Sequence, residues 1–245
     1  MSSVIVMTSG KGGTGKTSVT GGVGAALALM GRTVLCLDAD VGLRNLDITL
    51  GMADTALMDF SDVMAGRCPL ERAVAAHPSI PRLSLLTAPL DLPEDFSGEE
   101  GFRALLDEAR TMFDYVLIDS PAGLGTGSRL AACGADRAVV VTVSDPSSLR
   151  DAQRVVAELD RLETIQLVVN RVRPRLLRQM GQTIDDAMDT AGLPLLGLVP
   201  EDRRVQLAAA AGRPVGQLTD RGAARAYANI ARRLDGQQVP LSRIR

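Results

Sequence analysis

The sequence predicts an α/β protein with a doubly wound, mostly parallel β-sheet flanked by helices. Short apolar runs alternate with helical patterns along nearly the whole chain. The runs are apolar at consecutive positions, which is typical of strands buried on both faces of a parallel sheet. Hydrophobic residues make up 46% of the 245 residues and aromatic residues only 2%, so we expect a large aliphatic core. The length suits one domain, predicted over residues 1–235, with a short tail at 236–245.

Seven strands and six helices are predicted to alternate along the chain. The strands lie near residues 3–7, 33–37, 83–87, 114–118, 138–143, 165–169 and 195–199. The helices lie near residues 16–30, 98–111, 148–162, 180–190, 203–211 and 221–234. This alternation implies right-handed crossovers between parallel strands. The carboxyl ends of the strands then share one edge of the sheet, where ligands bind in such folds.

The chain contains only two lysines, Lys11 and Lys16, and both lie in one loop, whereas its other 25 strongly basic residues are arginine. Arginine substitutes for lysine on a solvated surface, but not where a compact ammonium must fit against phosphate oxygens in a tight backbone turn. The shared position of the two lysines therefore indicates a phosphate-binding site.

The same loop matches the P-loop pattern G-x-x-x-x-G-K-T. It follows a predicted strand and opens a predicted helix, so its backbone N–H groups and the helix N-terminus can face phosphates. Lys16 is expected to contact the β- and γ-phosphates, and the Thr17 hydroxyl to bind Mg²⁺. The nucleotide-binding residues predicted here are Gly10, Lys11, Gly12, Gly13, Thr14, Gly15, Lys16, Thr17 and Ser18. The pattern predicts a P-loop NTPase.

Lys11 distinguishes this loop from an ordinary P-loop. A lysine directly after the first glycine marks the deviant Walker A motif, and in this feature the chain resembles the MinD/ParA family of SIMIBI-type ATPases. The resemblance implies that Lys11 reaches the phosphates held by the other subunit of an ATP-bound homodimer and acts in catalysis much as an arginine finger does. A second phosphate contact within the same subunit is the alternative.

Residues 38–47, with the sequence D-A-D-V-G-L-R-N-L-D, resemble the first switch of that family. The resemblance implies that Asp40 orients the attacking water and that Asp38 assists catalysis at the metal. Asn45 would lie near the nucleotide at the dimer face. For the two aspartates, helix capping is the alternative.

Four apolar residues ending in Asp119 are typical of a Walker B strand, whose aspartate holds Mg²⁺ through water. The continuation D-S-P-A-G resembles the second switch of the family. The resemblance implies that the backbone N–H of Gly123 senses the γ-phosphate.

Asn170 and Arg171 follow a predicted strand. The resemblance implies that Asn170 reads the adenine edge and that Arg171 packs over the base. The asparagine amide offers both a donor and an acceptor, and the N-K-x-D motif of guanine readers is absent, so ATP or ADP is expected. A simple turn residue is the alternative for Asn170. The second wall of the pocket is implied to be Pro200, Glu201 and Asp202.

The helix predicted at 148–162 carries Arg150, Asp151 and Arg154 near its start. The resemblance implies that this helix lies on the face that recruits partner proteins. The alternative is that these three residues form an ordinary solvated helix face.

The only histidine, His77, lies next to a proline and is expected to be a surface loop residue. Cys36, Cys68 and Cys133 match no metal-binding spacing, which fits a reducing cytoplasm. It also argues against the iron–sulfur site of some relatives, which needs paired cysteines beside the switches.

The tail after Gly236 is short. The resemblance implies an amphipathic membrane-targeting helix here, and we expect it to be missing or reduced, with Pro240 breaking its start. Its remaining apolar and basic residues are Val239, Leu241, Arg243, Ile244 and Arg245. The expected location is the cytoplasm, with peripheral attachment to the inner face of the plasma membrane as the alternative.

The resemblance implies an ATPase that uses Mg²⁺, dimerises with ATP and positions the cell-division septum. Its partners would be a MinC-like division inhibitor and a MinE-like or other activator. The alternative is a ParA- or FlhG-like ATPase that positions DNA or flagella. The net charge of −2 gives no basic footprint, so no specific nucleic acid is expected. A metabolic ligase of the cobyrinate or biotin pathway is disfavoured by the sequence of residues 42–47.

Overall fold

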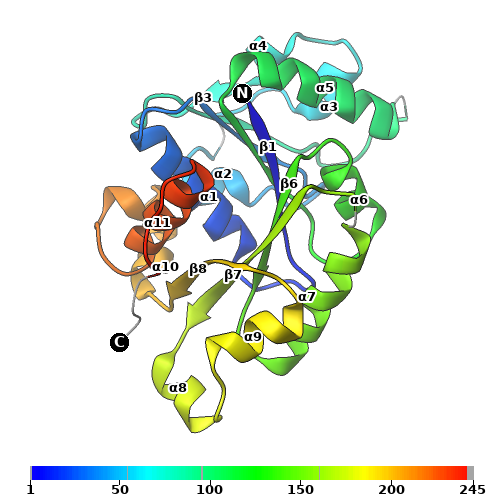
Figure 1. Cartoon of the computed structure of the whole chain (residues 1–245). Helices are drawn as coiled ribbons and strands as arrows, with labels where there is room; N and C mark the ends of the chain where they lie inside the picture. The colour runs from blue at the N-terminus through cyan, green and yellow to red at the C-terminus, as the bar shows by residue number, and fades with distance from the viewer. Residues whose placement is uncertain (1, 54, 95, 160, 242–245) are drawn as a thin grey trace.

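The computed structural model describes residues 2–53, 55–94, 96–159 and 161–241, in which eight strands form one sheet between two layers of helices (Figure 1). The strands are β1 (Ser3–Thr8), β2 (Val34–Asp38), β3 (Ala75–Ala76), β4 (Leu83–Leu86), β5 (Tyr115–Asp119), β6 (Arg137–Thr142), β7 (Thr164–Val172) and β8 (Leu195–Pro200). Their order is β3-β4-β2-β5-β1-β6-β7-β8, and only the pairing of β3 with β4 is antiparallel. The doubly wound, mostly parallel sheet is confirmed.

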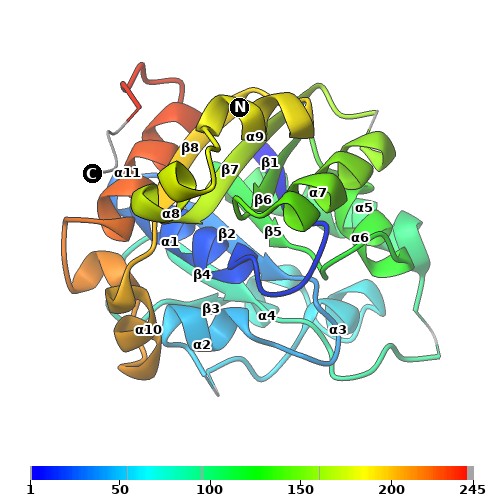
Figure 2. The ribbon, with the colours of Figure 1, turned by 90° about the horizontal axis from the view of Figure 1, so that it is seen from below.

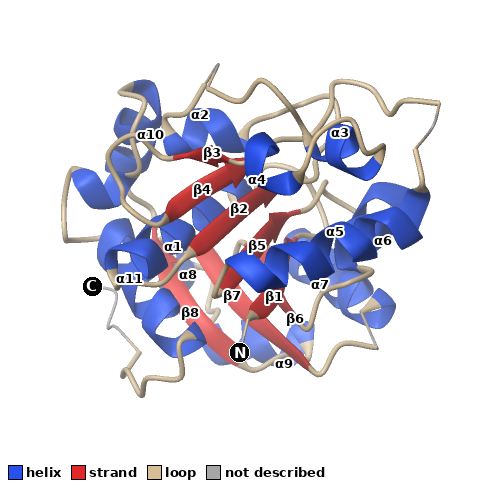
Figure 3. Ribbon diagram, turned by 90° about the horizontal axis from the view of Figure 1, so that it is seen from above, coloured by secondary structure: helices blue, strands red, loops and turns tan. Residues whose placement is uncertain are grey.

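Helices cover both faces of the sheet (Figure 3). One layer contains α1 (Lys16–Leu29), α2 (Leu46–Leu50), α10 (Arg203–Ala210) and α11 (Ala223–Leu234). The other contains α3 (Phe60–Met64), α4 (Leu70–Ala73), α5 (Gly98–Met112), α6 (Thr126–Ala132), α7 (Pro146–Glu158) and α9 (Ile184–Ala191). A further helix α8 (Pro174–Gln179) and a 3₁₀ turn η1 (Val215–Gln217) complete the described elements.

Alternate residues of each central strand contribute to two separate cores. On β1, Val4 and Val6 pack under the layer that contains α5, whereas Ile5 and Met7 pack under the layer that contains α1. All four side chains are fully buried. This double burial is the reason that the strands are apolar at consecutive positions.

Several helix boundaries differ from those predicted. The helix predicted at 148–162 begins at Pro146, because Asp145 accepts the Ser148 N–H as an N-cap and a proline follows it. The helix predicted at 180–190 begins later, because residues 180–183 are not helical and α9 starts only after Thr183, which forms a capping box. The short elements show no readable period and were not predicted: strand β3, helices α2, α3, α4, α6 and α8, and the turn η1.

The prediction for His77 is wrong, because the side chain is buried and fully engaged. Its Nε2 lies 2.9 Å from the carbonyl oxygen of Leu50, and its Nδ1 accepts the N–H groups of Ser79 and Ile80. Burial lowers its pKa, which keeps the ring neutral. Since Leu50 ends α2, the ring fastens that helix to the loop before β4.

The start of the tail is attached to the last helix. The Arg233 guanidinium donates to the carbonyl oxygens of Val239 and Pro240 at 2.9 and 2.8 Å. Arg243, Ile244 and Arg245 lie outside the described residues. Within the described part, no helix combines the length and the apolar character that crossing a bilayer requires.

Candidate nucleotide-binding site

The P-loop connects β1 to α1 at the carboxyl edge of the sheet, where Figure 2 shows it passing between α1 and α7. Gly13 and Gly15 have φ angles of 82° and 86°, in the left-handed region that favours glycine. A Cβ on Gly15 would also overlap the Asn170 amide nitrogen. The loop therefore requires glycine at Gly15 for both its backbone angle and its neighbour.

Lys16, Thr17 and Asp119 meet in the interior below this loop. The Lys16 ammonium donates to Asp119 Oδ1 at 2.8 Å, and the Thr17 hydroxyl donates to Asp119 Oδ2 at 2.7 Å. A third bond comes from the hydroxyl of Thr20, 2.9 Å from Asp119 Oδ1. The structure thus brings together the predicted phosphate lysine, magnesium threonine and Walker B aspartate.

Asp38 lies beside this cluster because β2 and β5 run parallel with Asp38 and Asp119 in register. It is almost fully buried and accepts the N–H groups of Asp40 and Leu46 at 2.9 and 3.1 Å. Burial, followed by repulsion from Asp119, raises the pKa of Asp38 to about 6. Because Leu46 begins α2, Asp38 holds the start of that helix, which fits the capping alternative. It also lies beside Asp119, and its role at a metal stays a prediction.

The carboxylate of Asp40 is free of hydrogen bonds to the residues that the structure describes. It is half-buried, and burial raises its pKa while the Lys16 charge opposes that shift. A carboxylate without a protein donor can accept a hydrogen bond from a water molecule. Asn45 directly precedes α2 and is exposed.

Lys11 points away from the Lys16 cluster. Its ammonium lies 3.2 Å from Asp145 Oδ1 and donates to the Ser147 hydroxyl at 2.8 Å. Although burial opposes it, the pKa of Asp145 falls below its usual range because Ser147, Ser148 and Lys11 all donate to its carboxylate. Lys11 therefore contacts the start of α7 within its own subunit.

Gly123 lies in the loop after β5 with a φ angle of 89°. Its N–H donates to the carbonyl oxygen of Ser9 at 2.9 Å, which ties the predicted second switch to the end of β1. A phosphate contact by this N–H would require the bond to Ser9 to open.

A cavity of about 640 Å³ opens beside the P-loop. Its lining includes every residue predicted for the base pocket: Asn170, Arg171, Pro200, Glu201 and Asp202. Gly15 and Ser18 form the end next to the P-loop.

Asn170 and Arg171 do not follow a strand as predicted but lie within β7. The pairing of β7 with β8 is irregular between Val169 and Val172, and Arg171 has a φ angle of 51°. This irregularity removes the two residues from the regular ladder. Asn170 is buried, and its Nδ2 donates to the carbonyl oxygen of Thr14 at 2.8 Å.

The walls of the cavity also have structural partners. Glu201 forms an ion pair with Arg173, and Asp202 accepts the Arg204 N–H as the N-cap of α10. Asp202 Oδ2 additionally accepts the N–H of Ala223, the first residue of α11, at 3.0 Å. Asp202 thus holds two helices at the cavity.

Several residues of the cavity were not predicted, among them the side chains of Arg203, Arg204, Gln206 and Tyr227. The first three follow Asp202 directly or nearly so in the chain, and extending the predicted wall into its helix could have found them. Tyr227 fits the apolar face of α11, and its sequence pattern carries no other signal. Asp145 and Ser147, the partners of Lys11, were also missed.

The site fits a magnesium nucleotide. Thr14 is buried, yet its hydroxyl has no partner among the described residues, which suits a phosphate oxygen. Thr17, Asp38 and Asp119 offer oxygen atoms, the ligands that Mg²⁺ prefers. No group of three or more His, Cys, Asp or Glu side chains that could hold a metal is found in the described residues.

Residues 5–215 match the family model described as the CobQ/CobB/MinD/ParA nucleotide binding domain. The chain is 39% identical to the septum site-determining protein MinD of Synechocystis, over 98% of this chain and 92% of that protein. The chain belongs to the MinD family.

Solved MinD-family structures agree with the fold. The MinC:MinD cell division protein complex of Aquifex aeolicus contains a chain with a TM-score of 0.91 at 35% identity, covering 99% of both chains. MinD of Pyrococcus horikoshii complexed with Mg-ADP gives a TM-score of 0.84 at 30% identity, covering 96% of both. The family membership extends over nearly the whole chain.

Proposed function

We propose that this chain is an Mg²⁺-dependent ATPase that dimerises with ATP and helps to position the cell-division septum. Membership of the MinD family supports the biological role, and the site supports the chemistry. The observation that carries the proposal is the cluster of Lys16, Thr17 and Asp119 beneath a glycine loop, with the unpaired carboxylate of Asp40 close by.

The reaction would be in-line attack by water on the γ-phosphorus of ATP. When bound, Mg²⁺ supplies charge neutralisation between the phosphates, and Thr17, Asp119 and Asp38 are the residues that would hold it. Lys16 would exchange its bond with Asp119 for one with a phosphate oxygen. Asp40 would accept a hydrogen bond from the attacking water and orient it.

Lys11 has a different role in the proposal. Its side chain reaches α7 rather than the Lys16 cluster, and its ion pair is partly exposed. It would leave Asp145 on dimerisation and contact the phosphates bound by the second subunit, where a cation stabilises transition-state charge. Gly123 would exchange its bond with Ser9 for a γ-phosphate contact.

The proposed partners are a MinC-like inhibitor and an activator protein. MinD of Aquifex aeolicus has been solved in a complex with MinC, and its similarity to this chain supports an equivalent partner. The face near Lys11, formed by the start of α7 with Arg150, Asp151 and Arg154, is the proposed recruiting surface. The protein would act in the cytoplasm, with peripheral attachment to the inner face of the plasma membrane as the alternative.

Co-sedimentation tests this proposal. The purified chain is centrifuged with anionic liposomes, and separately with duplex DNA, in Mg-ATP and in Mg-ADP. Liposome binding only with Mg-ATP would support the septum-positioning role, and we expect no DNA binding with either nucleotide. DNA binding without liposome binding would contradict the septum-positioning role and support a DNA-positioning ATPase.

A further inference from the structure

Tyr227 is a buried tyrosine whose hydroxyl has no hydrogen bond to any described residue. It lies on α11 and is only 2% exposed. Its ring packs so closely on α1 that a Cβ on Gly22 would overlap it. The sequence pattern puts Tyr227 on the apolar face of a helix, as for an ordinary core side chain. In the structure it also lines the 640 Å³ cavity beside the P-loop.

The surroundings of the hydroxyl are polar. Burial raises the pKa of Tyr227, the charge of Arg171 opposes that shift and the charge of Asp202 adds to it. Both of these residues also line the cavity. The Thr14 hydroxyl is closed off from solvent, but the Tyr227 hydroxyl oxygen keeps some access to it although the ring is buried. Because Tyr227 lines the cavity, we infer that this oxygen faces the cavity. The hydroxyl therefore suits a partner that arrives with a ligand.

The cavity extends from the P-loop to α11, with Gly15 and Ser18 at one end and Tyr227 among its other walls. A nucleotide whose phosphates lie in the loop must place its nucleoside along this cavity. One N–H of the Asn170 amide is used by the bond to Thr14, which leaves its second N–H and its Oδ1 for the nucleoside. Tyr227 offers a further polar group in the same cavity.

We propose that the Tyr227 hydroxyl hydrogen-bonds the nucleoside part of the bound nucleotide and so adds a binding residue to the site. This inference rests on the proposed binding of ATP and ADP.

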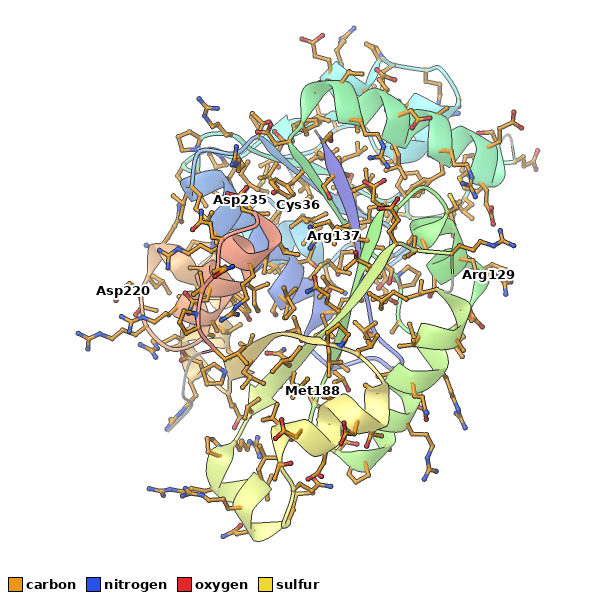
Figure 4. The ribbon with its side chains drawn as sticks, viewed as in Figure 1. Cys36, Arg129, Arg137, Met188, Asp220 and Asp235 are labelled. Atoms are coloured by element: carbon orange, nitrogen blue, oxygen red, sulfur yellow. The ribbon has the colours of Figure 1, made fainter. Side chains whose placement is uncertain are left out.

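The other tyrosine of the chain provides a matched control. The Tyr115 hydroxyl donates to Asp235 Oδ1 at 3.0 Å. Tyr115 begins β5, at the edge of the sheet opposite to the P-loop, and Asp235 directly follows α11 (Figure 4). A change from tyrosine to phenylalanine removes a hydroxyl that is hydrogen-bonded to Asp235 at Tyr115, and at Tyr227 one without a partner among the described residues.

The test measures thermal unfolding without nucleotide and calorimetric affinity for Mg-ADP. We expect Tyr227→Phe to unfold at the same or a higher temperature than the wild type and to bind Mg-ADP about 2- to 10-fold more weakly, the usual effect of one lost hydrogen bond. Tyr115→Phe should unfold at a lower temperature and bind Mg-ADP as the wild type does.

Two results would overturn the inference. One is wild-type affinity for Mg-ADP in Tyr227→Phe. The other is a lower unfolding temperature of Tyr227→Phe without nucleotide, which would assign the hydroxyl a structural role. A wild-type chain that does not bind Mg-ADP would instead overturn the proposed nucleotide binding, so the two failures are distinguishable.

Discussion

The two lysines of this chain lie in one loop, yet their surroundings differ in burial and in partners. The Lys16 side chain is 6% exposed and its partner Asp119 is 2% exposed, whereas the figures are 37% for Lys11 and 43% for Asp145. Lys16 contacts a carboxylate that also binds two hydroxyl groups. Lys11 contacts the capping group of an exposed helix start.

This difference separates a lysine that can leave its carboxylate only when a phosphate replaces it from one that can be released without a replacement. Breaking a buried ion pair leaves an uncompensated charge in a medium of low polarity, whereas an exposed pair contributes little to stability. Lys16 is therefore part of the folded core as well as of the site. Lys11 can exchange its partner at low cost, as a contact to a second subunit requires.

Replacing Lys16 should have the largest effect. In Lys16→Gln, Asp119 remains buried without its cation, and we expect a loss of about 3–5 kcal/mol in unfolding free energy. Mg-ATP hydrolysis should also be lost. Urea unfolding of the nucleotide-free protein measures the first effect. A variant as stable as the wild type would show that the pair is not the buried contact described.

The next effect concerns Asp38 and pH. Its pKa of about 6, against 3.8 as the ordinary value, means that the folded protein binds this proton more tightly than the unfolded chain does. The contribution of this group to stability therefore rises as the pH falls from above 6 toward 4, by roughly 3 kcal/mol at most.

Urea unfolding between pH 7 and pH 4.5 measures this contribution as the difference between the wild type and Asp38→Asn. The wild type should gain stability relative to the variant on acidification. A difference that does not vary with pH would show that Asp38 titrates normally.

The sheet was predictable because its strands carry their own signal. Ile5 and Met7 face one core and Val4 and Val6 the other, so each strand appears as an unbroken apolar run. Short elements were not predictable, since α2 contains too few residues for a period and is held by distant contacts. Its first N–H binds Asp38, and its last carbonyl oxygen binds His77.

The site residues were predictable where the chemistry requires one residue type at a fixed spacing. They were not predictable where the packing of distant elements brings a side chain to the site. The phosphate loop demands glycine and lysine at fixed spacing, which a sequence displays directly. Tyr227 reaches the cavity only because α11 packs against α1 at Gly22, a contact between residues about 200 positions apart. The meeting of Lys11 with Asp145 likewise depends on where the fold places α7.

Asp40 should matter for hydrolysis and little for folding. Because its carboxylate makes no hydrogen bond with the described residues, Asp40→Ala should change the unfolding free energy by less than about 1 kcal/mol. Activator-stimulated hydrolysis should fall about 100-fold or more, and the ATP-bound dimer should accumulate. Asp40→Asn keeps the size of the side chain but removes its charge, and it should show the same loss of hydrolysis as Asp40→Ala. Unchanged stimulated turnover in either variant would exclude the proposed role.

Lys11 should show the smallest effect on folding and a specific effect on assembly. Lys11→Ala removes a partly exposed pair, so its unfolding free energy should stay within about 1 kcal/mol of the wild type. Mg-ATP binding should persist, because Lys16 and the loop backbone remain. Sedimentation velocity with Mg-ATP should nevertheless show a monomer.

The matched variant Lys11→Arg keeps the charge but not the compact ammonium. If Lys11 must fit against phosphate oxygens across the interface, the arginine variant should also fail to dimerise. Dimerisation of Lys11→Ala with ATP would contradict the contact between subunits. If Lys11→Arg dimerises and Lys11→Ala does not, the contact between subunits still holds, and any cation at this position is sufficient whatever its shape.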